Sequence, residues 1–397
     1  MKKLFWLVMA FVVCGTDMVR AAAEEYEVRP KALPEIQAAG FTGGGPSNLF
    51  PRIKGIYNGL IMPTNDFLAE YSGFFEITVD TDRDFRGWMN VGNRRYPLRG
   101  RFNQQGAAGI TIYRRDWDDC HCTYDLRLIW IIDLQLIPGT DELEGFADNV
   151  WRGWSTSLFG FRGHGTLDGI SIDEGRYTMR LPGNADSSVA PGGEGYGVVK
   201  VTSRSKVQMY GALADGTAYS RSASVSTNGW WPFYLPLSQG TGALIGWLRF
   251  ATLPDSDVFG DLYWVKARLD GRKYYPDGFT GNVAATGSRY TPPFSTSLAL
   301  NWTDGFFRLE GGNLAVPAAN SITLLPGGKL ADGGGDLTNL KYSLSRSTGI
   351  FRGKFIHPNT GRLASFAGVL DQWQAVGGGY FLGLDQTGLV RLEAAAP

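Results

Sequence analysis

Short stretches of alternating apolar and polar residues recur along most of the chain. At 75–79, 177–181 and 340–344 every second side chain is apolar, which is the period of a β-strand with one face against a core. Apart from the N-terminal segment and a short stretch at 34–39, no window of about a dozen residues has the period of an amphipathic helix. The pattern predicts an all-β protein with very little helix.

The same order of motifs occurs twice, at an offset of about 120 residues. One copy opens with Gly-Ile-Tyr at 55–57 and the other with Gly-Arg-Tyr at 175–177, and each continues through a glycine-aromatic strand to a later hairpin. A partial third copy begins at Gly349. An internal repeat of this kind indicates successive units with one supersecondary design.

Glycine recurs inside these copies in the pattern apolar, any residue, Gly, any residue, apolar. Because glycine normally weakens a strand, its return at matched positions indicates a bulge, a sharp bend, or room for a bulky side chain from the opposite wall. Bent, coiled strands suit a small barrel, and closure removes exposed sheet edges. The sequence therefore favours barrels over flat sandwiches.

We expect two successive antiparallel meander units, folded as small closed or nearly closed β-barrels. The first unit is expected at 53–172 and the second, larger one at 173–397, with 300–397 as a candidate partial third repeat. The stretch 24–52 is rich in proline and glycine and has little periodicity, which is typical of a flexible leader.

The first 23 residues have the order of a secretory signal peptide. Lys2 and Lys3 precede an apolar run at 4–13, and alanines follow at 21–23, where cleavage is expected. The run is too short to cross a bilayer. The sequence thus predicts an exported bacterial protein that is periplasmic, cell-surface or extracellular, with no transmembrane span after signal cleavage.

Charge argues against a nucleic-acid partner. The chain has 38 basic and 38 acidic residues and a formal net charge of zero, and the basic residues are scattered rather than gathered in a stripe. Electrostatic attraction to phosphate therefore has little to act on. We expect no nucleic acid among the partners.

Cys120 and Cys122 are the two cysteines left after signal cleavage, and they flank His121. A structural zinc normally takes four ligands, and the only other histidines are His164 and His357. Two thiols or a strained bridge at the start of a strand, and a metal site at Cys120 and Cys122, are the alternatives. No cofactor is expected. Aspartates at 80, 82 and 84 similarly allow a calcium loop or a hairpin turn.

Tryptophans are the remaining candidates for a binding site, because the chain has 12 of them. Trp230 and Trp231 are adjacent, so in an extended strand one faces the core and the other faces solvent or a partner. An exposed indole is a platform for a sugar ring, whereas a loop tryptophan can simply close a barrel end. Trp151 and Trp154, near Arg152, have the same two interpretations.

The opening Gly-Ile-Tyr-Asn-Gly-Leu at 55–60 and the Gly-Glu-Gly-Tyr-Gly at 193–197 resemble an uncharacterised β-rich repeat of large exported bacterial proteins. That resemblance implies export and β structure and brings no catalytic residues. More loosely, a glycine-aromatic opening followed by a meander is similar to the small barrels of surface transferrin-binding proteins. This second similarity concerns the fold only.

No nucleophile elbow, phosphate-binding glycine loop or zinc-protease helix motif occurs in the sequence. We therefore expect a secreted or cell-surface, non-enzymatic β-repeat protein with a binding or structural role, whose partner is an unknown extracellular protein or glycan. The alternatives are a carbohydrate-binding or glycan-degrading exported protein and, third, an outer-membrane β-barrel.

Overall fold

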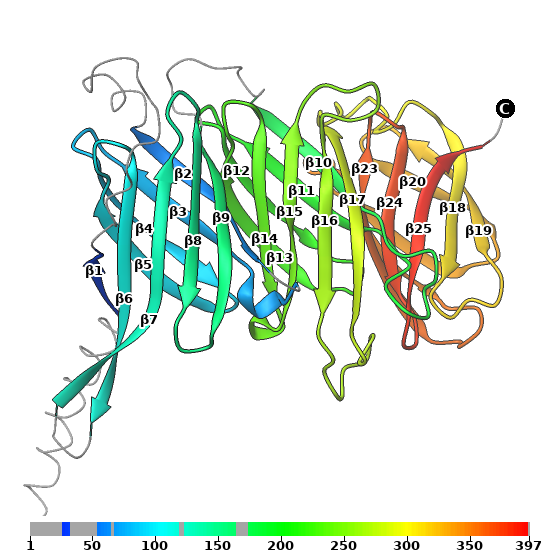
Figure 1. Ribbon diagram of the computed structural model, residues 1–397. Coiled ribbons are helices and arrows are strands. Elements are labelled where there is room, and N and C mark those ends of the chain that lie inside the picture. Colours follow the sequence, from blue (N-terminus) through cyan, green and yellow to red (C-terminus); the bar gives the residue numbers. More distant parts are fainter. Residues whose placement is uncertain (1–25, 32–53, 65–66, 119–122, 164–173, 396–397) are drawn as a thin grey trace, which may run out of the picture.

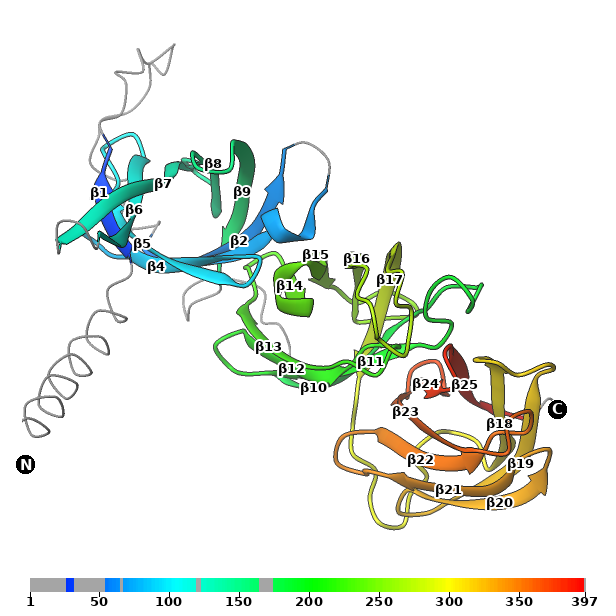
Figure 2. The ribbon, with the colours of Figure 1, turned by 90° about the horizontal axis from the view of Figure 1, so that it is seen from below.

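The computed structural model describes residues 26–31, 54–64, 67–118, 123–163 and 174–395. These residues form three antiparallel sheets of nine, eight and eight strands. Each sheet curls around its own core, and the three lie in a row along the sequence (Figures 1 and 2). The prediction of an all-β fold of nearly closed barrels is confirmed. The expected signal peptide at 1–23 lies outside the described residues.

The first barrel has the strand order β1-β6-β7-β8-β9-β2-β3-β4-β5, and its edge strands β5 and β1 lie against each other. A single-turn 3-10 helix, η2, separates β2 from β3. The elements are β1 (Tyr26–Pro30), β2 (Gly55–Pro63), η2 (Ala69–Tyr71), β3 (Gly73–Val79), β4 (Asp84–Val91), β5 (Arg94–Arg101), β6 (Ala107–Asp118), β7 (Thr123–Leu136), β8 (Glu142–Asn149) and β9 (Trp154–Arg162).

The second barrel has the order β13-β12-β11-β10-β17-β16-β15-β14, with its edges β13 and β14 in contact. Its elements are β10 (Gly175–Leu181), β11 (Gly195–Val201), β12 (Lys206–Ala212), β13 (Ala218–Ser224), β14 (Trp230–Leu237), the 3-10 helix η3 (Ser238–Gly240), β15 (Gly242–Phe250), β16 (Val258–Lys266) and β17 (Phe279–Arg289).

The third barrel has the order β20-β19-β18-β25-β24-β23-β22-β21, closed by contact between β20 and β21. Its strands are β18 (Asp304–Gly311), β19 (Ala318–Leu325), β20 (Lys329–Gly335), β21 (Thr338–Leu344), β22 (Ile350–Ile356), β23 (Leu363–Asp371), β24 (Val376–Leu382) and β25 (Thr387–Ala394). No helix in the described part of the chain is long and apolar enough to cross a membrane.

The expected number of units was wrong, because the chain forms three barrels rather than two. The segment given as a partial third repeat builds a complete eight-stranded sheet with its own aromatic core. Phe307, Phe351, Phe355 and Phe381 are each at most 1% exposed in that core. A separate buried core makes the last hundred residues a unit in their own right.

One segment of the stretch expected to be a flexible leader is ordered. Tyr26–Pro30 forms β1, which pairs with β6 so that Val28 lies opposite Ile112. Val28 is buried, and the Tyr26 ring lies 5.0 Å from that of Tyr96. This strand lies between β5 and β6 and fills the gap at which the first barrel would otherwise be open.

The recurrent glycines make room for aromatic rings on the adjacent strand. Phe85 lies opposite Gly100, and Phe366 lies opposite Gly353. A Cβ atom on Gly100 would come within 2.8 Å of the Phe85 ring, and one on Gly353 within 2.6 Å of the Phe366 ring. The expected room for a bulky side chain therefore exists, but the ring comes from the neighbouring strand and not from the opposite wall. Such cross-strand packing supports strongly coiled sheets.

Gly368→Ala is expected to destabilise the third barrel by about 1–3 kcal/mol, the usual cost of overpacking a core. Gly368 lies opposite Phe351, and an added Cβ would overlap that ring and stand 2.7 Å from the Cα of Gly379. Urea unfolding measures the change. Gly281→Ala is the matched control, because no atom lies within 4 Å of its added Cβ. Equal stability of the two variants would contradict the packing argument.

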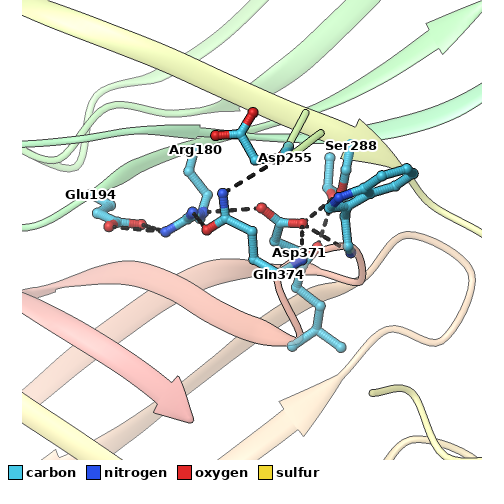
Figure 3. A network of polar contacts seen from close by, with 9 residues as sticks. Arg180, Glu194, Asp255, Ser288, Asp371 and Gln374 are labelled. Carbon is cyan, nitrogen blue, oxygen red and sulfur yellow. Dashed lines mark hydrogen bonds and ion pairs between the residues drawn. The ribbon is translucent and has the colours of Figure 1, made fainter. Parts of the chain in front are cut away.

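Neighbouring barrels are joined by buried contacts. Between the first and second, the Tyr234 hydroxyl donates to the carbonyl of Gly92 at 3.0 Å. Between the second and third, Arg180, Glu194 and Asp371 form a polar network beside the β10–β11 and β23–β24 pairs (Figure 3). The barrels therefore pack against each other rather than hanging on free linkers.

Candidate functional site

A pocket lies at one end of the first barrel, beside the β8–β9 turn seen at the bottom of that barrel in Figure 1. Its volume is about 110 Å³, room for on the order of ten water molecules. Strands and turns of the first barrel supply most of the lining, and residues at the η3 turn of the second barrel, Gln239, Gly240 and Thr241, close one side. We call this cavity the mouth pocket.

Packed aromatic rings form the wall of the mouth pocket. Tyr71 stacks on Trp154 with ring centroids 4.1 Å apart and planes at 19°. Trp130 meets Trp154 edge to face at 5.0 Å and Tyr96 at 5.6 Å. Tyr26, from the strand that fills the barrel gap, extends the cluster at Tyr96. Offset and edge-to-face packing of this kind fixes the rings in place.

Two buried indole N–H groups in this wall have no acceptor among the described residues. They are the Nε1 atoms of Trp130, which is fully buried, and of Trp154. A buried donor left without a partner costs about 1–3 kcal/mol, and tryptophan can only donate. Both residues line the pocket. Both nitrogen atoms are sealed from the open space of the pocket, so the unmet donors are a cost of packing this wall.

Trp151 stands at the rim of the pocket and is 51% exposed. The guanidinium carbons of Arg114 and Arg127 lie 4.9 and 5.4 Å from the centre of its ring. Asp116 pairs with Arg114 at 2.6 Å and with Arg127 at 3.4 Å. The side-chain hydrogen bond from Arg114 lowers the pKa of Asp116 below its usual value. At the rim, the exposed indole of Trp151 thus contacts two arginines, and both arginines pair with Asp116.

The remaining charges at the pocket also favour an acceptor-rich ligand. Arg94 and Arg152 join Arg114 in the lining, and Glu70 is the only carboxylate among the lining residues that the structure describes. Arg152 lies 3.6 Å from Glu70. The lining therefore combines a surplus of donors with flat aromatic surfaces.

The structure brings together two of the four tryptophans proposed from the sequence. Trp151 and Trp154 share the mouth pocket. Trp231 faces the core of the second barrel and is 1% exposed, so it offers no surface to a ligand. Trp230 points the opposite way, as strand alternation requires, and stacks against Phe161 of the first barrel at 6.2 Å. It belongs to the junction between barrels.

The sequence also offered two candidate metal sites, one at the cysteines and one at the aspartates at 80–84. Cys120 and Cys122 lie outside the described residues, and within the described ranges no group of three or more His, Cys, Asp or Glu side chains could hold a metal ion. The aspartates at 80–84 form the β3–β4 turn, where the Asp80 carboxylate accepts the N–H groups of Asp82 and Asp84 at 2.9 and 3.0 Å. The hairpin interpretation of this segment is confirmed.

Sequence reasoning missed Tyr71 and Trp130. Trp130 stands in an apolar run that indicates nothing more than a buried strand, and Tyr71 lies in the short η2 turn. Nothing local marks either as a site residue, because strand pairing alone carries residues some 60 positions apart to one end of the barrel.

No protein-family model matches the sequence, and no curated protein matches it. The solved structures similar to this chain include transferrin-binding protein B, as the resemblance in the sequence predicts. The double mutant from Haemophilus parasuis is 10% identical, with 85% of this chain and 75% of that chain covered and a TM-score of 0.21. The protein from Neisseria meningitidis is 10% identical over 85% and 76%, with a TM-score of 0.19.

A protein of unknown function from Nostoc punctiforme, of the DUF3598 family, is 7% identical, with 87% of this chain and 98% of that chain covered and a TM-score of 0.17. With TM-scores this low, none of these likenesses carries an argument about function. The geometry of the mouth pocket is the better guide to what the protein binds.

Proposed function

We propose that this protein is exported and acts as a non-enzymatic binding protein that holds a glycan end in the mouth pocket of its first barrel. The exposed ring of Trp151 carries the proposal, because it stands at the rim of an aromatic-walled pocket with arginines beside it. A sugar offers what the pocket lacks, namely oxygen acceptors on a ring with a flat apolar face.

The carboxylates near the pocket support binding rather than glycan cleavage. A general acid needs a raised pKa, whereas the pKa of Asp116 is lowered and its charge is shared by two arginines. Glu70 faces the guanidinium of Arg152. Both carboxylates thus serve to position cations at the rim.

A protein partner is the second candidate, and the exposed rim favours it. Val150 and Trp151 are 48% and 51% exposed side by side, and arginines flank the indole. Trp, Tyr and Arg are the residues most enriched in interface hot spots. Such a partner would place an acidic or amide side chain in the pocket.

The outer-membrane alternative is disfavoured by the outward face of the first barrel. On β4 and β5 the exposed positions include Arg86, Arg95 and Arg99. Arginine on a lipid-facing strand is costly near the bilayer centre. We propose that the barrels are in water, and cell fractionation into periplasmic, surface and medium fractions tests the location.

Trp151→Ala is expected to weaken glycan binding about tenfold or more, since a central aromatic anchor is typically worth more than 1 kcal/mol. The measurement is a glycan array with the protein purified after export, followed by titration of any glycan that binds. Phe294→Ala is the matched control, because Phe294 is an exposed aromatic residue far from the pocket lining. Glycan binding that survives Trp151→Ala unchanged would contradict the proposal.

A further inference from the structure

A second groove lies on the outer face of the third barrel, where it meets the second. It has a volume of about 810 Å³ and is lined by residues of β21, β22 and β23 together with Tyr196 of β11. Three of its lining residues are cations, namely Lys341, Arg352 and Lys354. No aspartate or glutamate is among the described residues that line it. We call it the basic groove.

The strand register gathers these cations on one face. Lys341 lies directly opposite Lys354 in the β21–β22 pair, and Arg352 is two residues from Lys354, so the two point to the same side of the sheet. All three are exposed. Like charges in directly opposite positions destabilise a sheet. The arrangement therefore costs stability in the free protein.

Nothing within the described residues neutralises this charge. Lys341, Arg352 and Lys354 form no ion pair or hydrogen bond there through their side chains. Exposed cations without an ion pair also occur elsewhere, as at Lys54 and Lys200, but the groove differs because three of them share one lining that has no described carboxylate. In a chain with zero net charge, an uncompensated cluster of this kind marks a local site for anions.

The rest of the groove combines small polar side chains with apolar ones. Asn339, Ser343 and Ser365 supply hydrogen-bonding groups, and Leu363, 60% exposed, supplies an apolar edge. Tyr196 is buried to 8% exposure and stacks on Tyr380 at 6.3 Å, so its ring face is already covered. Phe366 is 3% exposed, and Tyr342 is partly buried against the core of the third barrel. The aromatic rings of the groove therefore offer little open face for the base stacking on which binding of single-stranded nucleic acid depends.

We infer that the basic groove binds an anionic polysaccharide, with Lys341, Arg352 and Lys354 contacting successive acidic groups and the small polar side chains contacting sugar hydroxyls. The groove is open and spans three strands, which suits an extended chain better than a compact ion. This site is separate from the mouth pocket and does not depend on the function proposed there.

The test compares the wild-type protein with Lys341→Ala/Lys354→Ala. The probes are dextran sulfate, polygalacturonate and neutral dextran, measured by calorimetry at low salt and near 0.15 M salt, where screening is strong. We expect the sulfated and the carboxylated chains to bind and neutral dextran not to. The double variant should bind about tenfold more weakly or worse, since charge-assisted contacts are the strong ones, and with a smaller salt dependence.

The control is Lys54→Ala/Lys200→Ala, which removes two exposed lysines that do not line the groove and should bind as the wild type does. The melting temperature distinguishes a loss of binding from a loss of folding. Because Lys341→Ala/Lys354→Ala relieves like-charge repulsion, its melting temperature should be no lower than that of the wild type. Three results would overturn the inference. They are equal weakening of binding by both double variants, no binding of dextran sulfate and none of polygalacturonate, and tighter binding of single-stranded DNA than of polysaccharide. Binding of polygalacturonate or of dextran sulfate alone identifies the acidic group.

Discussion

Trp231→Ala is expected to destabilise the second barrel by about 3–5 kcal/mol, the usual cost of removing a large buried aromatic side chain. Trp231 is 1% exposed and packs against Phe233 and Phe250, with ring centroids 5.8 and 5.9 Å away. Truncation leaves a cavity that these rings cannot fill. Urea or thermal unfolding followed by tryptophan fluorescence and circular dichroism measures the change.

The matched control is Phe294→Ala, because Phe294 is 80% exposed and its loss should leave the unfolding midpoint nearly unchanged. Trp231→Phe keeps much of the buried volume and should fall between the two. A midpoint for Trp231→Ala equal to that of the control would contradict the core assignment. Any loss of ligand binding in Trp231→Ala would therefore result from instability of the barrel and not from a lost contact with the ligand. In Trp151→Ala, by contrast, the contact with the ligand itself is removed.

Alternation in the sequence predicted the fold class because its cause is local. Every second side chain of a half-buried strand faces the core, so β structure was readable from single segments, and the opposite facing of Trp230 and Trp231 followed from the same rule. The alternation did not predict the number of barrels. The third barrel contains β20, Lys329–Gly335, which is glycine-rich and almost entirely exposed, so its signal is weak.

Long-range pairing explains the other misses. β1 has five residues and lies among prolines and glycines, so its alternation was too short to stand out. It is ordered because the gap beside β6 gives Val28 a core to enter. The mouth pocket joins Tyr71, Trp130 and Trp154 through the closure of the barrel, and of these only Trp154 was proposed from the sequence.

Asp371→Ala is expected to weaken the junction between the second and third barrels by about 1–3 kcal/mol, since buried donors that lose their acceptor carry the full cost of desolvation. The Asp371 side chain is 2% exposed and its Oδ2 lies 3.5 Å from Nε of Arg180, itself 11% exposed. Its Oδ1 accepts the Ser288 hydroxyl at 2.7 Å and the Trp373 N–H at 3.1 Å (Figure 3). Arg180 keeps Glu194 at 3.3 Å.

Asp371 terminates β23 and orders the turn after it, so its loss should act on the third barrel and on its contact with β10 together. Unfolding should separate into two transitions, and limited proteolysis should cut between β17 and β18 faster than in the wild type. Asp371→Asn preserves the Oδ1 acceptor and removes only the charge, so it apportions the loss between hydrogen bonds and ion pair. Asp277→Ala is the control, because Asp277 is 86% exposed and 4.0 Å from Arg268. A single transition at the wild-type midpoint for Asp371→Ala would show that apolar contacts alone hold these barrels together.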